Sequence, residues 1–405
     1  MSKLVALTGN SALAHAFKQV EPDVYAAYPI TPSTQITEEF SEYVADGLVK
    51  TEFVPTESEH SAMSACIGAA AAGARAATTT SSQGLALMHE VLYIAASYRL
   101  PMIMAVVNRA LSGPLNIHAD HSDTMGSRDC GWIQIYSEGA QEAYDNLFQA
   151  VLIGEHPEVR LPVMVCMDGF IVSHSLEGVE LIRDETAKKF IGENKPPFSL
   201  LDVDQPVTFG PNDLSDYYTE HRKQQSEAIK NAMPVIREVA RRWEEVTGRA
   251  YGYFEPYRIE DAEYIVLAIG SVAGTIKDAV DELRQGGLKA GLLKVRVYRP
   301  FPGEEIAQAI RNAKAVAVMD RADAFGALGG PLFTDVAAAL YDNPDQPHCI
   351  NYVYGLGGRD VSLENVFGVY HRLEEIARTG KLGQRCQYLT VRSEDHGQEP
   401  ALEIT

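Results

Sequence analysis

The residues with the clearest chemical potential lie in the segment Asn108–Trp132, NRALSGPLNIHADHSDTMGSRDCGW. It follows an apolar run at 101–107, PMIMAVV, which is typical of a buried strand in a sheet covered on both faces. Arg109 is therefore expected at the carboxyl end of a strand, the edge at which open α/β sheets bind ligands. Its guanidinium could hold a substrate carboxylate with two parallel hydrogen bonds, or it could pair with Asp120 or Asp123 to hold the loop.

The same segment contains other polar residues that could act near a substrate. His118, Asp120, His121 and Asp123 are residue types that can bind zinc or iron. Their spacing matches no standard set of metal ligands, so we favour a hydrogen-bonded active-site loop over a metal site. We place Asn116 in this loop too, and expect that the loop can close over a substrate.

A second group of candidates surrounds Glu59. The segment at 56–62, TESEHSA, leads into a stretch of small residues, SACIGAAAAGA. Carboxylates are favoured at a helix start, so capping alone could explain Glu57 and Glu59. However, the small residues that follow would let a flat ligand approach closely. A carboxylate in such apolar surroundings would have a raised pKa and could share a proton with a ring nitrogen.

Two turns between strands and helices could complete this site. In AAYPITPST at 26–34, two prolines make the turn rigid and present Thr31 at the sheet edge. In SSQGLALMHE at 81–90, the turn could place N–H groups against an anion or a polar ring. Both turns could also be purely structural. Because Thr31 and Arg109 end neighbouring predicted strands, we expect both to face one crevice.

The candidate residues require an α/β framework to position them. Helical patterns alternate with short apolar runs in the amino-terminal half, which predicts parallel strands with crossover helices. The predicted strands are the runs at 24–28, 77–81, 101–107 and 162–168, and one helix is predicted at 84–98 between the second and the third. A second α/β unit begins with the strand YIVLAIG at 264–270 and ends with a helical pattern at 363–379. Between the two units we expect a linker that lies over the surface, with a charged helix at 221–246.

These patterns predict four regions along the chain. We expect an α/β domain at 1–190, a linker with a long helix at 191–256, a second α/β domain at 257–385 and a tail at 386–405. The second domain contains glycine-rich turns at 270–274, 325–330 and 354–360. None of them fits the dinucleotide pattern G-x-G-x-x-G with its acidic partner, which disfavours nicotinamide binding.

Composition excludes several classes of function. The 405-residue chain has a formal net charge of -20, which argues against sequence-independent binding to nucleic acid. It has no run of about 20 apolar residues, and its start lacks the long apolar core of a signal peptide, so we expect a cytoplasmic protein without a membrane span. Its five cysteines form no C-x-x-C pair, so an iron–sulfur cluster would have to lie on another chain.

Taken together, the motifs identify a family. YPITPST, ESEHSAM, TSSQGLALMHE, NRALSGPLNIHADHSD, RDCGW and VCMDGF resemble the alpha subunit of the 2-oxoacid:ferredoxin oxidoreductases, most closely the pyruvate branch. Downstream, GSVAGT, VRVYRPFP, AVMDRADAFGALGGPL and YGLGGRD resemble the second domain of that subunit. The resemblance implies a pyrimidine-binding domain of the thiamine diphosphate fold, followed by a domain like the carboxyl-terminal domain of transketolase.

The resemblance also implies roles for individual residues. Glu59 matches the glutamate that hydrogen-bonds the aminopyrimidine ring of thiamine diphosphate. Thr31 and Arg109 match the residues expected to hold the 2-oxo group and the carboxylate of the substrate. The active-site loop is expected to flank the substrate. The further cofactor contacts implied by position are Pro29, Ile30, Ser82 and Gln83.

The resemblance further implies that this chain supplies only half of an active site. It lacks the G-D-G…N-N signature that binds magnesium and diphosphate in thiamine enzymes. A beta subunit would then bring the diphosphate pocket, Mg²⁺ and a [4Fe-4S] cluster, while gamma and delta subunits would complete coenzyme A handling and electron transfer to ferredoxin. The implied reaction is the reversible oxidative decarboxylation of pyruvate with coenzyme A to acetyl-CoA and CO2.

Several alternatives remain open at this point. The substrate could be 2-oxoglutarate, a branched-chain 2-oxo acid or oxalate, although a second carboxylate would need another cation and oxalate would favour a basic residue at position 31. The chain could also be the beta chain of a thiamine-dependent dehydrogenase complex, but its long linker and its Arg109 loop argue against that. A non-enzymatic scaffold is disfavoured because Glu59, Thr31 and Arg109 are all present.

Overall fold

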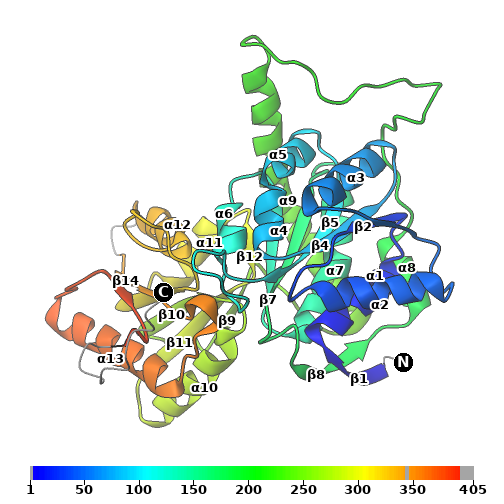
Figure 1. The fold of residues 1–405 in the computed structure, drawn as a ribbon. Coiled ribbons are helices and arrows are strands. Elements are labelled where there is room, and N and C mark those ends of the chain that lie inside the picture. Colours follow the sequence, from blue (N-terminus) through cyan, green and yellow to red (C-terminus); the bar gives the residue numbers. More distant parts are fainter. Residues whose placement is uncertain (1–2, 343–345, 393–405) are drawn as a thin grey trace, which may run out of the picture.

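The computed structural model describes residues 3–342 and 346–392, which form two α/β units joined by a long helix (Figure 1). Each unit has its own mainly parallel sheet, one of seven strands and one of six. A third sheet pairs only β1 (Lys3–Thr8) with β8 (Leu176–Leu181). Within the described ranges, no helix has both the length and the apolar composition needed to cross a membrane. The predicted α/β class is confirmed.

The first sheet has the strand order β12-β6-β7-β5-β4-β2-β3. Six of its strands come from the first unit and run parallel: β2 (Val24–Ala27), β3 (Glu52–Pro55), β4 (Ala76–Thr80), β5 (Met102–Asn108), β6 (Ile133–Ser137) and β7 (Val163–Asp168). The four apolar runs predicted as strands are β2, β4, β5 and β7. The other two lack such a run, because β3 exposes both of its end residues and β6 buries the polar Gln134 and Ser137.

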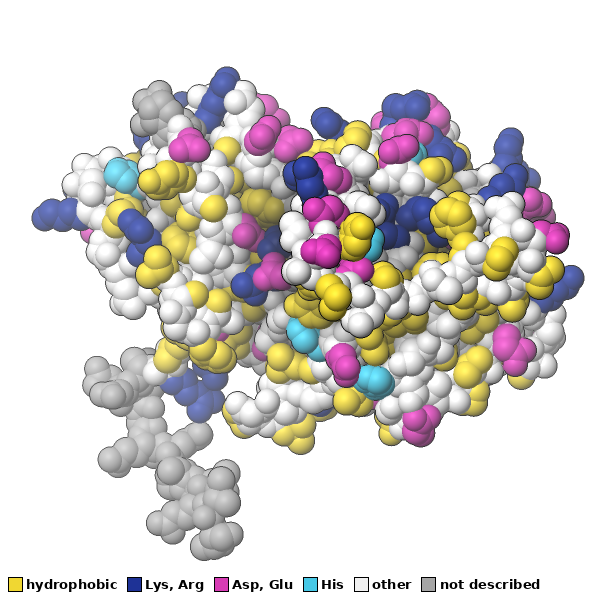
Figure 2. Space-filling model, turned by 90° about the horizontal axis from the view of Figure 1, so that it is seen from above, with side chains coloured by type: hydrophobic (Ala, Val, Ile, Leu, Met, Phe, Trp, Pro, Cys, Tyr) yellow, Lys and Arg dark blue, Asp and Glu magenta, His cyan; other side chains and the backbone are white. Residues whose placement is uncertain are grey.

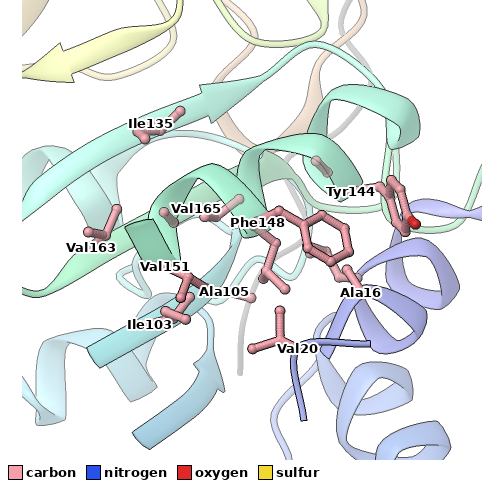
Figure 3. Close-up of a cluster of buried hydrophobic side chains, with 14 of the residues drawn as sticks. Ala16, Val20, Ile103, Ala105, Ile135, Tyr144, Phe148, Val151, Val163 and Val165 are labelled. Atoms are coloured by element: carbon pink, nitrogen blue, oxygen red, sulfur yellow. The ribbon is translucent and has the colours of Figure 1, made fainter. Parts of the chain in front are cut away.

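Helices cover both faces of this sheet. One group consists of α1 (Gly9–Val20), α2 (Thr34–Ala45), α7 (Ala140–Glu155) and α8 (Asp184–Ile191), and the other of α3 (Glu59–Ala71), α4 (Ser82–Leu87), α5 (His89–Ser97) and α6 (Ser122–Gly126). In β5, Ile103 and Ala105 join the core of the first group, where they pack with Phe148 of α7 (Figure 3). Met104 joins the core on the opposite face, so the continuous apolar run marks a strand buried on both sides.

Two helical predictions need correction. The pattern at 84–98 predicted one helix, but the chain breaks at Met88 into α4 and α5. The helix predicted at 221–246 forms as α9 (Tyr218–Thr247), and one side of it is part of the core, which the expected surface linker did not include. Apolar residues at helical spacing form one side of α9, and this side packs against α7 in the core of the first unit. Its Trp243 stacks on Phe148 with ring centroids 5.2 Å apart.

The second sheet has the strand order β15-β14-β13-β10-β11-β9, and only β9 runs antiparallel to its neighbour. The strands are β9 (Phe254–Tyr257), β10 (Tyr264–Ile269), β11 (Ala290–Val295), β13 (Ala315–Asp320), β14 (His348–Val353) and β15 (Cys386–Tyr388). The helices of this unit are α10 (Val272–Gln285), α11 (Gly303–Ile310), α12 (Pro331–Leu340) and α13 (Leu363–Thr379), with a short helix η1 (Leu356–Gly358) after β14. The expected tail at 386–405 thus begins with an edge strand, and 393–405 lie outside the described residues.

The two units are interlocked. β12 (Val297–Arg299) follows β11 of the second unit but pairs antiparallel with β6 of the first sheet. Beside it, the fully buried Arg296 donates hydrogen bonds to Asn146 (2.8 Å) and Gln149 (2.9 Å) of α7. This strand pairing and these buried bonds hold the second unit against the first. The domain boundaries at 190, 256 and 385 stay predictions.

Candidate active site

The turns that contain the candidate residues meet at the carboxyl edge of the first sheet. The strands before Thr31 and Arg109, β2 and β5, are not direct neighbours as expected, because β4 lies between them. All three run parallel, so the turns that follow them lie at one edge. These turns contain Thr31, Ser82 and Arg109. The Arg109 Nη1 donates a hydrogen bond of 3.0 Å to the main-chain oxygen of Thr31, which confirms that the two turns are in contact.

Arg109 is held by main-chain carbonyls and not by a carboxylate. Besides Thr31, its guanidinium donates from Nε to the main-chain oxygen of Asn116 at 3.1 Å, and the residue is 8% exposed. Burial lowers the pKa of Arg109, while nearby Asp123 opposes the shift. Neither Asp120 nor Asp123 forms an ion pair with it among the described residues, so the pairing proposed by the alternative is wrong, although the guanidinium still bonds to the loop through Asn116. The Nη2 group remains available to an anion.

Glu59 is buried without a hydrogen-bond partner among the described residues. It is the first residue of α3 and is 6% exposed. Helix capping does not explain it, because Ser58 provides the cap by accepting from the N–H of Ser61 at 3.2 Å. The hydroxyl of Thr80, at the end of β4, is also buried and unpaired. Both groups border Gly84, where a Cβ would lie 2.7 Å from the Glu59 Oε1 and 2.4 Å from the Thr80 Oγ1.

Asp123 faces the interior and ties strand ends together. Its Oδ2 accepts from the main-chain N–H groups of Ser82 and Arg109 at 3.0 Å each, and its Oδ1 accepts from Asn108 at 2.8 Å. Burial raises the pKa of Asp123 to about 6, against the opposing effect of these N–H donors. The structure therefore gives Asp123 a role in fixing the sheet edge, and the expectation that its loop flanks the substrate stays a prediction.

The turn after β4 uses its own polar groups. Ser82 has a φ of +46°, its N–H donates to Asp123, and its hydroxyl donates to the main-chain oxygen of Ala110 at 2.5 Å. The Gln83 Oε1 lies 2.6 Å from the same hydroxyl and shares its single hydrogen, and Gln83 is half-buried. The cofactor contacts proposed for Ser82 and Gln83 stay predictions. Pro29 is exposed and Ile30 half-buried in the turn before Thr31, which is itself exposed.

Comparisons with known proteins agree with this geometry. A family model described as "Pyruvate flavodoxin/ferredoxin oxidoreductase, thiamine diP-bdg" matches residues 15–241, and a model described as "Pyruvate:ferredoxin oxidoreductase core domain II" matches residues 262–366. The first match covers more than half of the chain. The chain belongs to the pyruvate flavodoxin/ferredoxin oxidoreductase family. The resemblance identified from the sequence motifs is confirmed.

Similar proteins from other organisms extend over nearly the whole chain. "Pyruvate synthase subunit PorA" of Thermotoga maritima is 58% identical, covering 96% of this chain and 98% of the relative. The protein of the same name in Methanocaldococcus jannaschii is 46% identical, covering 93% and 96%. "Ketoisovalerate oxidoreductase subunit VorA" of Pyrococcus abyssi is 42% identical, covering 94% and 96%.

Two solved structures show the same fold at low sequence identity. A 2-oxoglutarate:ferredoxin oxidoreductase from Magnetococcus marinus matches with a TM-score of 0.69 and 19% identity, covering 92% of this chain and 65% of that longer chain. A split-gene transketolase matches with a TM-score of 0.55 and 13% identity, covering 92% and 99%. The thiamine diphosphate fold expected for this family is therefore confirmed.

The family model that matches residues 15–241 is described as thiamine diphosphate-binding, and Glu59 suits the pyrimidine ring of this cofactor. An aminopyrimidine presents ring nitrogens and an amino group at the edge of a flat surface. The Glu59 carboxylate could bond to such a group, and Gly84 adds no side chain beside it. No three His, Cys, Asp or Glu side chains converge as metal ligands within the described ranges.

One polar cluster between the two units was missed from the sequence. Asp168, at the end of β7, accepts from the His121 Nε2 at 2.6 Å, from the Arg321 Nη1 at 2.8 Å and from the N–H of Ser271 at 2.9 Å. Burial alone would raise the pKa of Asp168, but Arg321 and His121 outweigh it and hold the pKa well below its usual range. His121 thus bonds to the end of a strand, and its predicted place in an active-site loop stays a prediction. The sequence signal that could have indicated this cluster is the charged residue at the end of each apolar run, because Asp168 ends PVMVCMD and Arg321 follows AVAVMD.

Proposed function

We propose that this chain is the alpha-type subunit of a thiamine diphosphate-dependent pyruvate:ferredoxin oxidoreductase. In this role it orients the pyrimidine ring of the cofactor and holds the 2-oxo acid. The observation that supports the assignment most strongly is the buried, unpaired Glu59 carboxylate at the same sheet edge as the Arg109 guanidinium. When bound, thiamine diphosphate supplies the electron sink that allows a 2-oxo acid to lose CO2.

Glu59 is proposed to hold a proton at a ring nitrogen of the pyrimidine. Its position at the start of α3, without a partner among the described residues, leaves its carboxylate free for one strong hydrogen bond. A hydrogen bond to a charged group is shorter and stronger than a neutral one, and it is strengthened further where water is excluded. Glu59 would therefore set the protonation of the ring and also fix its orientation.

Arg109 and Thr31 are proposed to hold the substrate. The two contacts of Arg109 to carbonyls use Nε and one Nη1 hydrogen, so Nη2 has no partner among the described residues and could donate to a carboxylate. The Thr31 hydroxyl, on the adjoining turn, is proposed to bond to the 2-oxo oxygen. Fixing both ends of a small 2-oxo acid would orient its reactive carbon against the cofactor ring.

Pyruvate is the proposed substrate. The relatives that are 58% and 46% identical to this chain are both named pyruvate synthase subunits. Position 31 is a threonine, so the turn adds no second cation for a dicarboxylate such as 2-oxoglutarate or oxalate. A branched-chain 2-oxo acid is the second candidate, because the VorA relative at 42% identity carries ketoisovalerate in its name.

Partner subunits are proposed to complete the site. The chain lacks the magnesium and diphosphate signature, so a beta subunit would supply that pocket and, with gamma and delta subunits, the [4Fe-4S] clusters. The segment 198–218 supports contact with a partner, because it exposes Phe198, Leu200, Leu201, Val203, Leu214, Tyr217 and Tyr218. In Figure 2, which looks down on the end from which this segment projects in Figure 1, apolar and acidic side chains are interspersed.

The proposal is tested by purifying the chain together with its partner subunits. The complex is assayed with coenzyme A and ferredoxin against pyruvate, 2-oxoglutarate and 2-oxoisovalerate. The proposal expects the highest kcat/KM for pyruvate, together with bound thiamine diphosphate and the absorbance of iron–sulfur clusters. A preference for another 2-oxo acid would change the substrate assignment. Reduction of a lipoyl domain instead of ferredoxin would overturn the proposed reaction.

A further inference from the structure

The loop after Arg109 contacts the second unit as well as its own sheet. We call residues 110–121, between β5 and α6, the substrate loop. Its base is closed by a bond of 2.9 Å from the N–H of Ala110 to the main-chain oxygen of His118. Its other half lies against residues 355–358, which follow β14 and which we call the glycine turn.

Three hydrogen bonds join the substrate loop to the glycine turn. The Asn116 Nδ2 donates to the main-chain oxygen of Gly357 at 3.1 Å, and the N–H of Gly357 donates to the Asp120 Oδ2 at 3.2 Å. The N–H of Gly358 donates to the main-chain oxygen of Ala119 at 2.8 Å. The loop takes part through two side chains and one main-chain carbonyl, and the turn takes part through its main chain, so these bonds fix the distance and the orientation of the loop relative to the turn.

The glycine turn has a shape that only glycine allows. Gly357 and Gly358 have φ values of +60° and +80°, in the left-handed region that disfavours side chains. A Cβ at Gly357 would lie 2.4 Å from the Asn116 Nδ2, and one at Gly358 would lie 2.4 Å from the Cβ of His118. The close approach of the two main chains therefore depends on both glycines.

The buried cluster around Asp168 anchors this arrangement. Arg321, which follows β13 of the second unit, bonds to Asp168 through its guanidinium and accepts from the N–H of His121 at 2.8 Å through its main-chain oxygen. His121 closes the substrate loop and bonds to the same Asp168. Since the three side chains are 6% exposed or less, the second unit has a fixed position next to the loop.

We propose that the second unit positions the Arg109 guanidinium for substrate through Asn116. The main-chain oxygen of Asn116 accepts from the Arg109 Nε, while its side-chain amide is held by Gly357. Asn116 thus connects the glycine turn to the guanidinium in two hydrogen bonds. Asn116 and Asp120 are thus positioning residues that bind the second unit. This inference rests on the proposed grip of Arg109 on the substrate carboxylate.

The test uses the assembled enzyme with the substitution Asn116→Ala. The main-chain contact to Arg109 remains possible, but the bonds to Gly357 and to the N–H of His118 are lost. The expected result is a KM for pyruvate about 10-fold higher, equivalent to the ~1.4 kcal/mol of a typical hydrogen bond, with kcat changed less than about 2-fold and the KM for coenzyme A unchanged. The matched control is Asn194→Ala, because the Asn194 Nδ2 also donates to a glycine carbonyl, that of Gly73 at 3.0 Å, in a different part of the first unit.

A double-mutant cycle separates positioning from a general structural effect. If Asn116 acts through Arg109, Asn116→Ala should have no further effect on the KM for pyruvate in an Arg109→Ala background. An undiminished effect there, or an unchanged KM in Asn116→Ala alone, would overturn the inference while the proposed grip stands. An unchanged KM in Arg109→Ala alone would instead reject the grip and, with it, this inference.

A second variant protects the test if Asn116→Ala fails to fold. Gly357→Ala changes only the second unit, and its methyl group would push the Asn116 amide away. We expect the same rise in the KM for pyruvate and the same loss of effect in the Arg109→Ala background. A folded Gly357→Ala enzyme with the normal KM would overturn the inference. Thermal unfolding of each complex checks that the variants compared are folded.

Discussion

Selected charged residues at the carboxyl edges of the two sheets differ in their hydrogen-bond partners. At the first edge, Glu59 has no hydrogen-bond partner among the described residues and Arg109 is held only by main-chain carbonyls. At the second edge, Asp320 accepts from the N–H groups of Leu332 (2.7 Å) and Phe333 (3.1 Å), and Arg321 is bonded to Asp168. Glu59 and part of the Arg109 guanidinium are thus left without a protein partner at the first edge, whereas the charged groups of the second edge hold the protein together. Asp123 and Asp168 of the first edge also hold the protein together, so the difference concerns only Glu59 and Arg109.

Glycines show the same difference. A Cβ at Gly84 would enter the space between the unpaired Glu59 and Thr80 of the first edge. In the second unit, a Cβ at Gly330 would lie 2.3 Å from the Cγ of Asp320, and one at Gly270 would lie 2.9 Å from the Asp168 Oδ2. The glycine-rich turns of the second unit therefore make room for internal contacts, which explains why they fit no nucleotide-binding pattern.

The largest expected effect comes from breaking the second edge. Arg321→Ala leaves the Asp168 carboxylate buried without its guanidinium, which should lower the free energy of unfolding by about 3–5 kcal/mol. The measurement is chemical or thermal unfolding. The exposed Arg311, changed to Ala, is the control and should stay within about 0.5 kcal/mol of the parent. If Arg321→Ala lowered the free energy of unfolding by no more than about 0.5 kcal/mol, the structural role of the second edge would be contradicted.

The pH dependence of this loss has a definite sign. Because the folded pKa of Asp168 is lowered, its ionised form stabilises the fold above its unfolded pKa of about 3.9, and this contribution fades as the pH falls through the folded value. In Arg321→Ala the carboxyl can be protonated more easily. The difference in stability between the parent and the variant should therefore be smaller at pH 4 than at pH 7.5.

The next effect concerns catalysis at the first edge. Glu59→Gln removes the proton-holding carboxylate but keeps its size, so the enzyme should assemble normally while kcat falls at least ~100-fold, the scale of a lost proton-transfer group. The matched control is Glu57→Gln, two residues away and exposed, which should keep normal turnover. Near-normal turnover in Glu59→Gln would refute the role proposed for this residue.

Arg109→Ala should have a smaller effect that falls on substrate capture. Loss of a charge-assisted partner should raise the KM for pyruvate by about 10- to 100-fold, as 1.5–3 kcal/mol of binding energy predicts. Arg128→Ala is the control, because the Arg128 guanidinium also donates to a main-chain carbonyl, that of Met125 at 2.8 Å. Unchanged saturation by pyruvate in the Arg109 variant would count against the grip.

The smallest effect expected is on cofactor affinity. The methyl group in Gly84→Ala would enter the space beside Glu59, so the Kd for thiamine diphosphate should rise about 10-fold, by the ~1–3 kcal/mol typical of overpacking. Equilibrium binding to the assembled complex measures it. Gly368→Ala, on α13 with no neighbour within 4 Å of the added Cβ, is the control and should leave the Kd unchanged. Equal Kd values for both variants would show that the first edge has no tight space for the ring.

The sequence predicted much of the first edge. Continuous apolar runs identified β2, β4, β5 and β7, and parallel strands must end at one edge, so Thr31 and Arg109 could be placed together without coordinates. The family motifs added Glu59. In each case the information is local, because it lies in the periodicity or the order of residues within one segment.

The contacts of the substrate loop and the second unit were not predictable in the same way. Asp120, His121 and Asp123 occur within four positions, yet they bond to different parts of the protein. Their partners are, in order, the glycine turn, the strand end at Asp168 and the main-chain N–H of Arg109. β12 likewise pairs with a strand about 160 residues earlier. Which of several polar side chains points inward depends on contacts between distant segments, and the spacing of residues does not encode it.

The central claim is that the Glu59 carboxylate meets the pyrimidine ring of thiamine diphosphate held by a partner subunit. The most direct test is an experimental structure of the assembled complex with thiamine diphosphate bound, in which the distance from the Glu59 carboxylate to the nearest ring nitrogen is measured. We predict a hydrogen bond of about 2.6–3.0 Å. A ring that lies beyond hydrogen-bond distance from Glu59, or a complex that binds no thiamine diphosphate, would contradict the claim.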